Sequence, residues 1–240
     1  MAKDTIFQDQ HTAEDFQFTP KVAEVFDDML DRSVPCYRQL IGMAGRLLKQ
    51  FLKDGDLIYD LGCSTGTTML ELCRRLSPID VQFIGIDSSP AMLSKASVKA
   101  EMYSKNDRLR FIEGDILQTE LHPAGAVLIN YTLQFIRPIE RQNLLDKIYQ
   151  ALRPGGVLIV SEKVISSDPL LNRTYINLYL EFKRNQGYSE IEIAKKREAL
   201  ENVLVPFTGE ENMRMIRKAA FATVEPFFQW FNFISYIAIK

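Results

Sequence analysis

Short apolar runs alternate with helical patterns along the chain from Leu57 to Ser161, and this alternation limits the possible folds more than any other feature. It is typical of βα units, in which a helix returns the chain so that the next strand runs parallel to the last. The runs are almost continuously apolar, as expected of strands that helices cover on both faces. The five predicted strands are 57–61, 82–87, 109–114, 126–131 and 156–161. The sequence therefore predicts an α/β fold built on a doubly wound, mostly parallel sheet.

Helices are predicted between these strands, at 67–77, 90–104 and 138–152. The second helix follows Ser88-Ser89-Pro90, where a serine can cap the helix and proline suits its first position. The third helix runs into the segment RPGG at 153–156, which we expect to end the helix and lead at once into the fifth strand.

Residues 1–56 precede the alternating region and are predicted to form a polar arm followed by two helices. The helices cover roughly 21–31 and 36–52, and the segment Ser33-Val34-Pro35 separates them, because the residue before a proline avoids the helical conformation.

Residues 162–207 follow the fifth strand and predict a helical insertion long enough to form a lid or an interface. Its two helices lie within 168–204. Another helix is predicted near 209–220, and two apolar runs at 223–230 and 233–239 predict an antiparallel strand pair that completes a seven-stranded sheet. We expect all of these segments to form one domain over 1–240.

The balance of charged residues gives no sign of a surface for nucleic acid. The formal net charge is −2, whereas binding to a phosphate backbone calls for a basic face. Three cysteines without a CxxC pair and two histidines support neither a disulfide framework nor a metal site. The N-terminus is polar, and the most apolar stretch, 226–239, is too short to span a bilayer. We expect a cytoplasmic protein with no metal, no membrane span and no direct contact with nucleic acid.

The segment Asp60–Gly66 follows a predicted strand and opens a predicted helix, as a nucleotide-binding glycine loop does. Its glycines, Gly62 and Gly66, permit a tight turn and close approach of a ligand. Asp87 ends the next strand, 25 residues after Gly62, where a carboxylate can accept hydrogen bonds from ribose hydroxyls. The pattern G-x-S-x-G differs from the G-x-G-x-x-G of a dinucleotide-binding loop.

Polar residues also lie at the ends of the next two predicted strands, as Asp87 does at the end of the second. Asp115, after the third strand, is placed to bond an adenine amino group, and Asn130 lies at the end of the fourth strand. Together the series resembles class I S-adenosylmethionine-dependent methyltransferases, which implies their Rossmann-like fold. Each residue also has a plainer interpretation: turn glycines, a helix cap at Asp87, and a solvated turn at Asp115. For Cys63, a small packed side chain is favoured over a nucleophile, because the sequence indicates no base beside it.

Several stretches outside the loop resemble the carboxy-S-adenosylmethionine synthase family. They are KDTIF (3–7), VAEVFDDML-DRSVPCY (22–37), NYTLQFI (130–136), LLDKIYQALRPGG (144–156), LIVSEK (158–163), FKRNQGYSEIEIAKKREALENVL (182–204) and WFNF (230–233). The resemblance implies a homodimer that converts S-adenosylmethionine and prephenate into carboxy-S-adenosylmethionine and phenylpyruvate. A partner enzyme then uses the product to modify the wobble uridine of tRNA.

The resemblance also implies a set of product-binding residues. They are Tyr37, Gly62, Cys63, Ser64, Asp87, Ser88, Asp115, Ile116, Asn130 and Arg197. The family more often has glycine at the position of Cys36, which raises a question about local backbone geometry. It more often has asparagine at the position of Ser88. The serine still offers a hydroxyl and a backbone amide near the adenosine, so this change puts little in doubt.

Arg197 is the residue expected to distinguish the carboxylated cofactor. Its run Lys195–Glu198 would otherwise be a solvated helix face, but a guanidinium can bind a carboxylate through two parallel hydrogen bonds. The Tyr37 hydroxyl can contribute another bond. We further expect Arg197, together with Arg32 or Arg184, near the dianionic substrate.

No catalytic residue is identified from the sequence. The mechanism that the family implies joins the carboxyl carbon of prephenate to an ylide made from the S-methyl group. No base for the methyl proton is evident, so proton transfer assisted by the substrate is favoured. Two alternatives stay open: an ordinary methyltransferase, and a protein that carries the carboxylated cofactor without making it.

Overall fold

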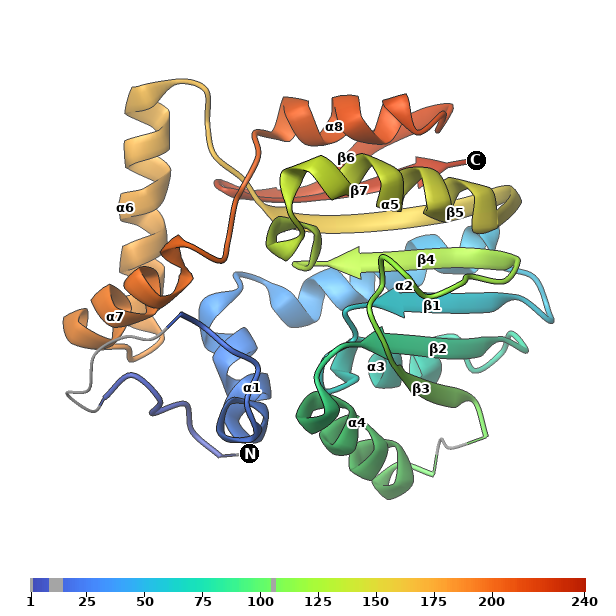
Figure 1. Cartoon of the computed structure of the whole chain (residues 1–240), viewed down its shortest axis with the longest axis horizontal. Helices are drawn as coiled ribbons and strands as arrows, with labels where there is room; N and C mark the ends of the chain where they lie inside the picture. The colour runs from blue at the N-terminus through green and yellow to red at the C-terminus, as the bar shows by residue number, and fades with distance from the viewer. Residues whose placement is uncertain (1, 9–14, 105–106) are drawn as a thin grey trace.

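A computed structural model describes residues 2–8, 15–104 and 107–240, and its centre is a seven-stranded sheet (Figure 1). The strands are β1 (Leu57–Leu61), β2 (Gln82–Asp87), β3 (Leu109–Glu113), β4 (Ala124–Asn130), β5 (Leu152–Lys163), β6 (Thr223–Trp230) and β7 (Phe233–Ile239). Their order across the sheet is β3-β2-β1-β4-β5-β7-β6. The first five are parallel, and β7 runs antiparallel to both of its neighbours. The predicted fold class and the terminal antiparallel pair are confirmed.

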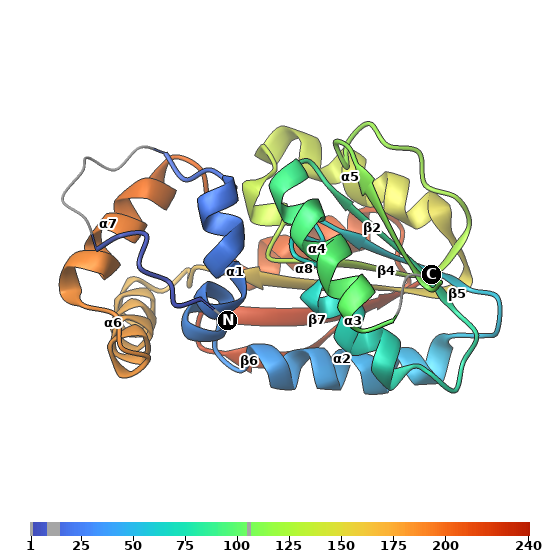
Figure 2. The ribbon, with the colours of Figure 1, turned by 90° about the horizontal axis from the view of Figure 1, so that it is seen from below.

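Helices cover both faces of this sheet. They are α1 (Pro20–Ser33), α2 (Tyr37–Phe51), α3 (Thr67–Arg75), α4 (Pro90–Met102), α5 (Pro138–Ala151), α6 (Pro169–Asn185), α7 (Glu190–Glu201) and α8 (Gly209–Lys218), with a 3₁₀ turn, η1, at Leu133–Phe135. Seen from below, α2 and α3 lie on one face, and α5 and α8 lie on the other (Figure 2).

Alternate residues of the central strands supply two separate hydrophobic cores. Ile58 and Leu128 pack with α2 and α3, whereas Tyr59 and Val127 pack with α5. Because successive side chains of a strand point to opposite faces, a strand buried on both sides must be apolar throughout. The continuous apolar runs of the sequence arise from this requirement.

The helix ends agree with the capping signals of the sequence. The Ser89 hydroxyl accepts a hydrogen bond from the Met92 amide, and Pro90 occupies the first position of α4. Ser189 and Glu192 form a reciprocal capping box at the start of α7. One expectation needs correction: β5 begins at Leu152, directly after α5, so RPGG lies inside a long irregular strand and does not separate the helix from it.

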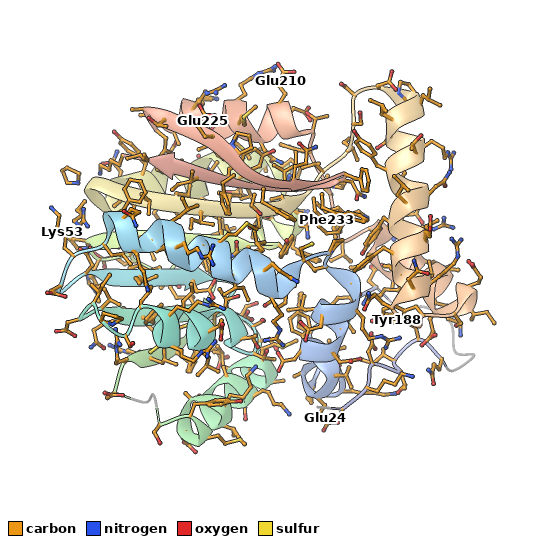
Figure 3. The ribbon with its side chains drawn as sticks, turned by 180° about the vertical axis from the view of Figure 1, so that it is seen from behind. Glu24, Lys53, Tyr188, Glu210, Glu225 and Phe233 are labelled. Carbon is orange, nitrogen blue, oxygen red and sulfur yellow. The ribbon has the colours of Figure 1, made fainter. Side chains whose placement is uncertain are left out.

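Beyond the carboxyl ends of β1 and β4 stand α1, α6 and α7 (Figure 1). The N-terminal arm lies against them, since the Tyr188 hydroxyl donates to Asp4 Oδ2 at 2.5 Å and the Phe16 amide donates to the Ala199 carbonyl at 2.9 Å. Figure 3 shows Tyr188 beside α1. The chain therefore builds a second layer over the end of the sheet where α/β proteins bind ligands.

Candidate functional site

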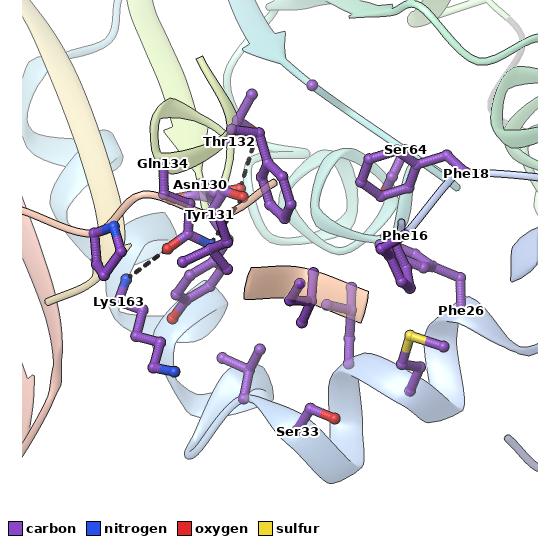
Figure 4. A pocket seen from close by; sticks show the side chains of 18 of the residues that line it. Phe16, Phe18, Phe26, Ser33, Ser64, Asn130, Tyr131, Thr132, Gln134 and Lys163 are labelled. Carbon is purple, nitrogen blue, oxygen red and sulfur yellow. Dashed lines mark hydrogen bonds between the residues drawn. The ribbon is translucent and has the colours of Figure 1, made fainter. Parts of the chain in front are cut away.

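A cavity of about 650 Å³ lies between the carboxyl ends of the parallel strands and the helices α1, α6 and α7 (Figure 4). Its volume is in the ordinary range of small-molecule sites. All ten residues expected from the sequence line it: Tyr37, Gly62, Cys63, Ser64, Asp87, Ser88, Asp115, Ile116, Asn130 and Arg197. The structure brings them together from six separate parts of the chain, while their binding roles stay predictions.

The glycine loop between β1 and α3 forms one wall of the cavity. Gly62 has φ of +78°, and a Cβ there would lie 2.6 Å from Thr132 Cγ2 and in hard contact with Thr132 Oγ1. Its amide donates to the Ile86 carbonyl at 2.8 Å, which holds the turn against β2. A side chain at this position would meet both steric and backbone strain, so the glycine is needed to bring the backbone to the cavity surface.

Asp87 joins the loop to the end of β2. Its carboxylate accepts hydrogen bonds from the amides of Ser64, at 2.8 Å, and Ser89, at 2.9 Å. Burial nevertheless raises the pKa of Asp87. Burial and the charge of Asp87 also raise the pKa of Asp60, to about 7. Two carboxyl groups with restricted hydration thus face the cavity, ready to accept hydrogen bonds from hydroxyl or ammonium groups of a ligand.

Cys63 is packed rather than reactive. Burial raises the pKa of its thiol, and a Cβ built on Gly85 would lie only 2.7 Å from its sulfur. The thiolate, which is the nucleophilic form, is therefore disfavoured. On the other side of β2, one carboxylate oxygen of Asp115 accepts from the Leu117 amide at 2.8 Å, so the exposed Asp115 is both a turn residue and part of the cavity wall.

Three lysines and Arg197 give the opposite wall a positive charge. Lys163 ends β5, Lys183 lies on α6, and Lys196 precedes Arg197 on α7. Burial lowers the pKa of Lys163 and Lys183, and the neighbouring lysines lower that of Lys183 further. Burial lowers the pKa of Lys196 to about 8, although Asp4 opposes this shift.

None of these three lysines was predicted from the sequence as a site residue. One signal was available for Lys163, because it lies two residues after the predicted strand 156–161, close to the strand ends at which Asp87 and Asn130 lie. Figure 4 shows its side chain reaching into the cavity beside Tyr131. Lys183 and Lys196 carry no comparable signal, since charged residues on a helix are usually solvated.

Full-length comparisons identify the family. A protein of Desulfotalea psychrophila named carboxy-S-adenosyl-L-methionine synthase is 56% identical over 238 residues, which cover 99% of this chain and 97% of that relative. A protein of the same name from Nitratiruptor sp. is 46% identical over 240 residues, covering 100% and 99%. A family model described as a methyltransferase domain matches residues 58–156. The chain belongs to the carboxy-S-adenosyl-L-methionine synthase family.

Solved structures that resemble this synthase-family chain carry the same fold. An O-methyltransferase family protein from Burkholderia thailandensis matches with a TM-score of 0.65 and 17% identity, over 93% of this chain and 60% of that one. Human N-acetylserotonin methyltransferase matches with a TM-score of 0.58 and 17% identity, over 92% and 55%. The Rossmann-like methyltransferase fold expected from the sequence is confirmed.

Cys36, where the resemblance implies a glycine, has an unusual backbone conformation. Cys36 has φ of +57°, the left-handed conformation that glycine adopts with the least strain. It precedes Tyr37, whose hydroxyl lies 3.4 Å from Thr68 Oγ1 and whose pKa is raised by burial. Tyr37 therefore keeps its proton and can donate a hydrogen bond into the cavity.

Arg32, expected near the dianionic substrate, does not line the cavity. Its guanidinium donates to the carbonyls of Gln186, at 2.8 Å, and Asp4, at 3.2 Å, and it stacks over the Tyr188 ring at 3.8 Å. These contacts hold the arm and the α6–α7 turn to α1, outside the residues that line the cavity.

Arg184 does not line the cavity either. It forms an exposed ion pair with Glu190. Within the described residues, no group of three or more histidine, cysteine or acidic side chains is arranged to hold a metal ion. In the same part of the chain, every helix is too short or too polar to cross a bilayer.

Proposed function

We propose that this protein converts S-adenosylmethionine and prephenate into carboxy-S-adenosylmethionine and phenylpyruvate. The observation that carries the proposal is that one cavity joins the glycine loop to a wall with four basic side chains, Lys163, Lys183, Lys196 and Arg197. The names of the full-length relatives support the identity of the product. A methyl donor alone would not call for such a wall, whereas a dianionic co-substrate and a carboxylated product both would.

The loop side of the cavity is assigned to the adenosyl substrate. Asp87 would accept hydrogen bonds from the ribose hydroxyls, and Asp115 with Ile116 would hold the adenine. Backbone at Gly62, Cys63 and Ser64 would approach the amino-acid tail. Asp60, whose pKa is about 7, lies near enough to accept from an ammonium group on the tail.

The proposed reaction balances without an external oxidant or base. Prephenate loses its ring carboxyl as carbon dioxide and its ring hydroxyl as the ring becomes aromatic, leaving phenylpyruvate. The S-methyl group loses a proton to the departing hydroxyl, which leaves as water. The methyl carbon then bonds to the carbon of carbon dioxide. The protein contributes by holding two oppositely charged reactants together and excluding water, which are effects of proximity and desolvation.

The new carboxylate is assigned to Arg197 and Tyr37. Arg197 is exposed at the rim of its own chain's cavity, and Tyr37 is buried on the adjoining wall. A planar guanidinium and a phenol can together bind a carboxylate through three hydrogen bonds. Unmodified S-adenosylmethionine lacks this anion, so the pair would favour retention of the product.

The proposed setting follows from the same resemblance. The product would serve an enzyme that modifies the wobble uridine of tRNA, and the synthase itself would act as a homodimer in the cytoplasm. The net charge of −2 supports an indirect connection to RNA, through the small-molecule product rather than through contact.

Turnover with prephenate tests the proposal directly. The purified protein should convert added S-adenosylmethionine into a species heavier by the mass of carbon dioxide, with one phenylpyruvate formed for each product, as measured by mass spectrometry. Methyl transfer to an added acceptor with no such species would favour an ordinary methyltransferase. A copurified carboxylated cofactor without any turnover would favour a carrier.

A further inference from the structure

Two lysines from distant parts of the chain share one aromatic ring in the cavity wall. The Nζ atoms of Lys163, on β5, and Lys183, on α6, lie 5.0 Å and 4.9 Å from the centroid of the Tyr179 ring. Both distances are within the range of cation–π attraction, and they place the two nitrogens no more than about 10 Å apart. Two carboxylates of one small molecule can reach across such a spacing.

The partners of these two lysines differ from those of Lys99, Lys147 and Lys196. The Lys99 ammonium pairs with Asp27 at 2.8 Å, Lys196 pairs with Asp4 at 3.7 Å, and Lys147 donates to three backbone carbonyls. Within the described part of the chain, neither Lys163 nor Lys183 has a carboxylate within 4.0 Å.

Lys183 has only 5% of its surface exposed, and Lys163 is half-buried. A shielded ammonium without an anion is costly, so the pair calls for a negative ligand. The cavity that both line is where such a ligand would enter.

Tyr179 fixes the spacing of the pair. Its hydroxyl donates to the Ser33 carbonyl at 2.9 Å, and its ring packs against Phe233 at 5.1 Å between centroids. The ring is therefore held at both its polar and its apolar end. A rigid aromatic support of this kind keeps two flexible lysine side chains near one position and lowers the entropy lost when a ligand binds.

We infer that Lys163 and Lys183, supported by Tyr179, form a subsite for the dicarboxylate co-substrate, separate from the Arg197 position that receives the new carboxylate. The inference rests on the proposed function, because it assigns a place to that reaction's second substrate. Lys196 is excluded from the pair, since Asp4 already compensates its charge and its Nζ donates to Ser33 Oγ at 3.0 Å.

The change in charge during the reaction implies that this subsite binds the substrate more tightly than the product. Prephenate brings two carboxylates, whereas phenylpyruvate leaves with one, because the other becomes part of the carboxylated cofactor. A site built for a dianion holds the monoanionic product less tightly. Burial also lowers the pKa of both lysines, and a bound dianion would oppose this shift by stabilising their charged forms.

The test measures each ligand separately in the full chain. Lys163→Met and Lys183→Met replace an ammonium with an apolar group of similar length. Each should raise the KM for prephenate by about tenfold or more, because a charge-assisted contact is lost. The dissociation constant of S-adenosylmethionine should stay within about twofold of the unaltered protein. Lys183→Arg should recover part of the loss, and Lys218→Met, at an exposed position on α8, is the matched control.

A second measurement covers the case in which a methionine variant folds poorly. Calorimetric titration into the unaltered protein should show that prephenate binds more tightly than phenylpyruvate, because the site is built for two carboxylates, and equal affinity for the two would overturn the subsite. An unchanged KM in both methionine variants would overturn the subsite, as would equal weakening of prephenate and S-adenosylmethionine. Failure of the unaltered protein to consume prephenate would instead overturn the proposed function, so the two failures are distinguishable.

Discussion

The two walls of the cavity are built in different ways. The cofactor wall comes from a loop of seven residues, Asp60–Gly66, and from the ends of neighbouring parallel strands, which topology alone places side by side. The cationic wall takes one residue each from β5 and α6 and two from α7, and these meet only through tertiary packing. A local sequence motif can therefore predict an adenosyl ligand. The residues proposed to bind the co-substrate come from distant segments, so no short motif predicts them.

Helix α1 connects the two walls. Its Asp27 accepts hydrogen bonds from Thr65 and Thr67, at 2.6 Å and 2.7 Å, and pairs with Lys99, which ties the helix to the glycine loop. Near its other end, Ser33 contacts both Lys196 and Tyr179. We therefore expect most substitutions in one wall to weaken the binding of one substrate, whereas a substitution in α1 should weaken the binding of both.

The largest expected effect is on the cofactor wall. Gly62→Ala should weaken S-adenosylmethionine binding by about 100-fold or more, because the new Cβ would collide with Thr132 and the left-handed backbone adds strain of about 1–2 kcal/mol. Titration calorimetry measures the change. Gly55→Ala is the matched control, since Gly55 also has positive φ but nothing lies within 4 Å of its added Cβ. Normal cofactor binding by Gly62→Ala would refute the assigned close approach.

The next effect tests the link between the walls. Asp27→Ala should reduce the free energy of unfolding by about 2–3 kcal/mol, because it leaves the Lys99 ammonium without its carboxylate. Denaturant unfolding measures this loss, and ligand titrations should show weaker binding of both substrates. The control is Glu24→Ala, at an exposed position of the same helix. Loss of affinity for one substrate alone would break the proposed connection.

Arg197→Met should separate the two forms of the cofactor. We expect the carboxylated form to bind about 2 kcal/mol more weakly, roughly 30-fold, with little change for S-adenosylmethionine, because only the former offers an anion. Competition binding with both forms measures the difference. Arg184→Met removes an arginine of the same segment that pairs with Glu190 outside the cavity lining, and it should change neither affinity. Equal weakening of both forms would contradict the assigned role.

The smallest expected effect is a pH dependence of the cationic wall. A lysine with a lowered pKa is cationic below that pKa and neutral above it. Lys163 and Lys183 both have lowered pKa values; the Tyr179 ring lies beside each of them, and Lys196 and Asp4 are further charged groups acting on Lys183. The KM for prephenate should therefore rise several-fold, up to about tenfold, as the pH increases from about 7 towards about 10, the ordinary pKa of a lysine. A KM independent of pH in this range would argue against lysine recognition.

Much of the fold was predictable because its signals are local. The segments 57–61, 82–87, 223–230 and 233–239 match their strands to the residue. The segments 57–61, 82–87 and 233–239 are mainly apolar runs, and a strand buried on both faces leaves little freedom in its position, whereas 223–230 is a partly exposed edge strand. The prediction was less accurate at β5, since pairing with β4 and β7 extends the strand across RPGG in spite of its proline and glycines.

The site was predictable only as far as the motif and the family resemblance reached. Strand-end residues such as Asp87 and Asn130 line the cavity because parallel strands end at one edge. Arg32 was misjudged because its partner, the Gln186 carbonyl, lies 154 residues away in the sequence. Lys183 was missed for the same reason: its burial and its position at Tyr179 depend on packing between distant segments.

The most direct test of the two-walled cavity is an initial-rate measurement in which both substrates are varied for two variants, Asp87→Ala and Lys183→Met. The structure predicts that Asp87→Ala raises the KM for S-adenosylmethionine by about tenfold or more and leaves that for prephenate nearly unchanged, and that Lys183→Met does the reverse. If each variant raises both KM values to a similar extent, the division of the cavity into a cofactor wall and a co-substrate wall is wrong.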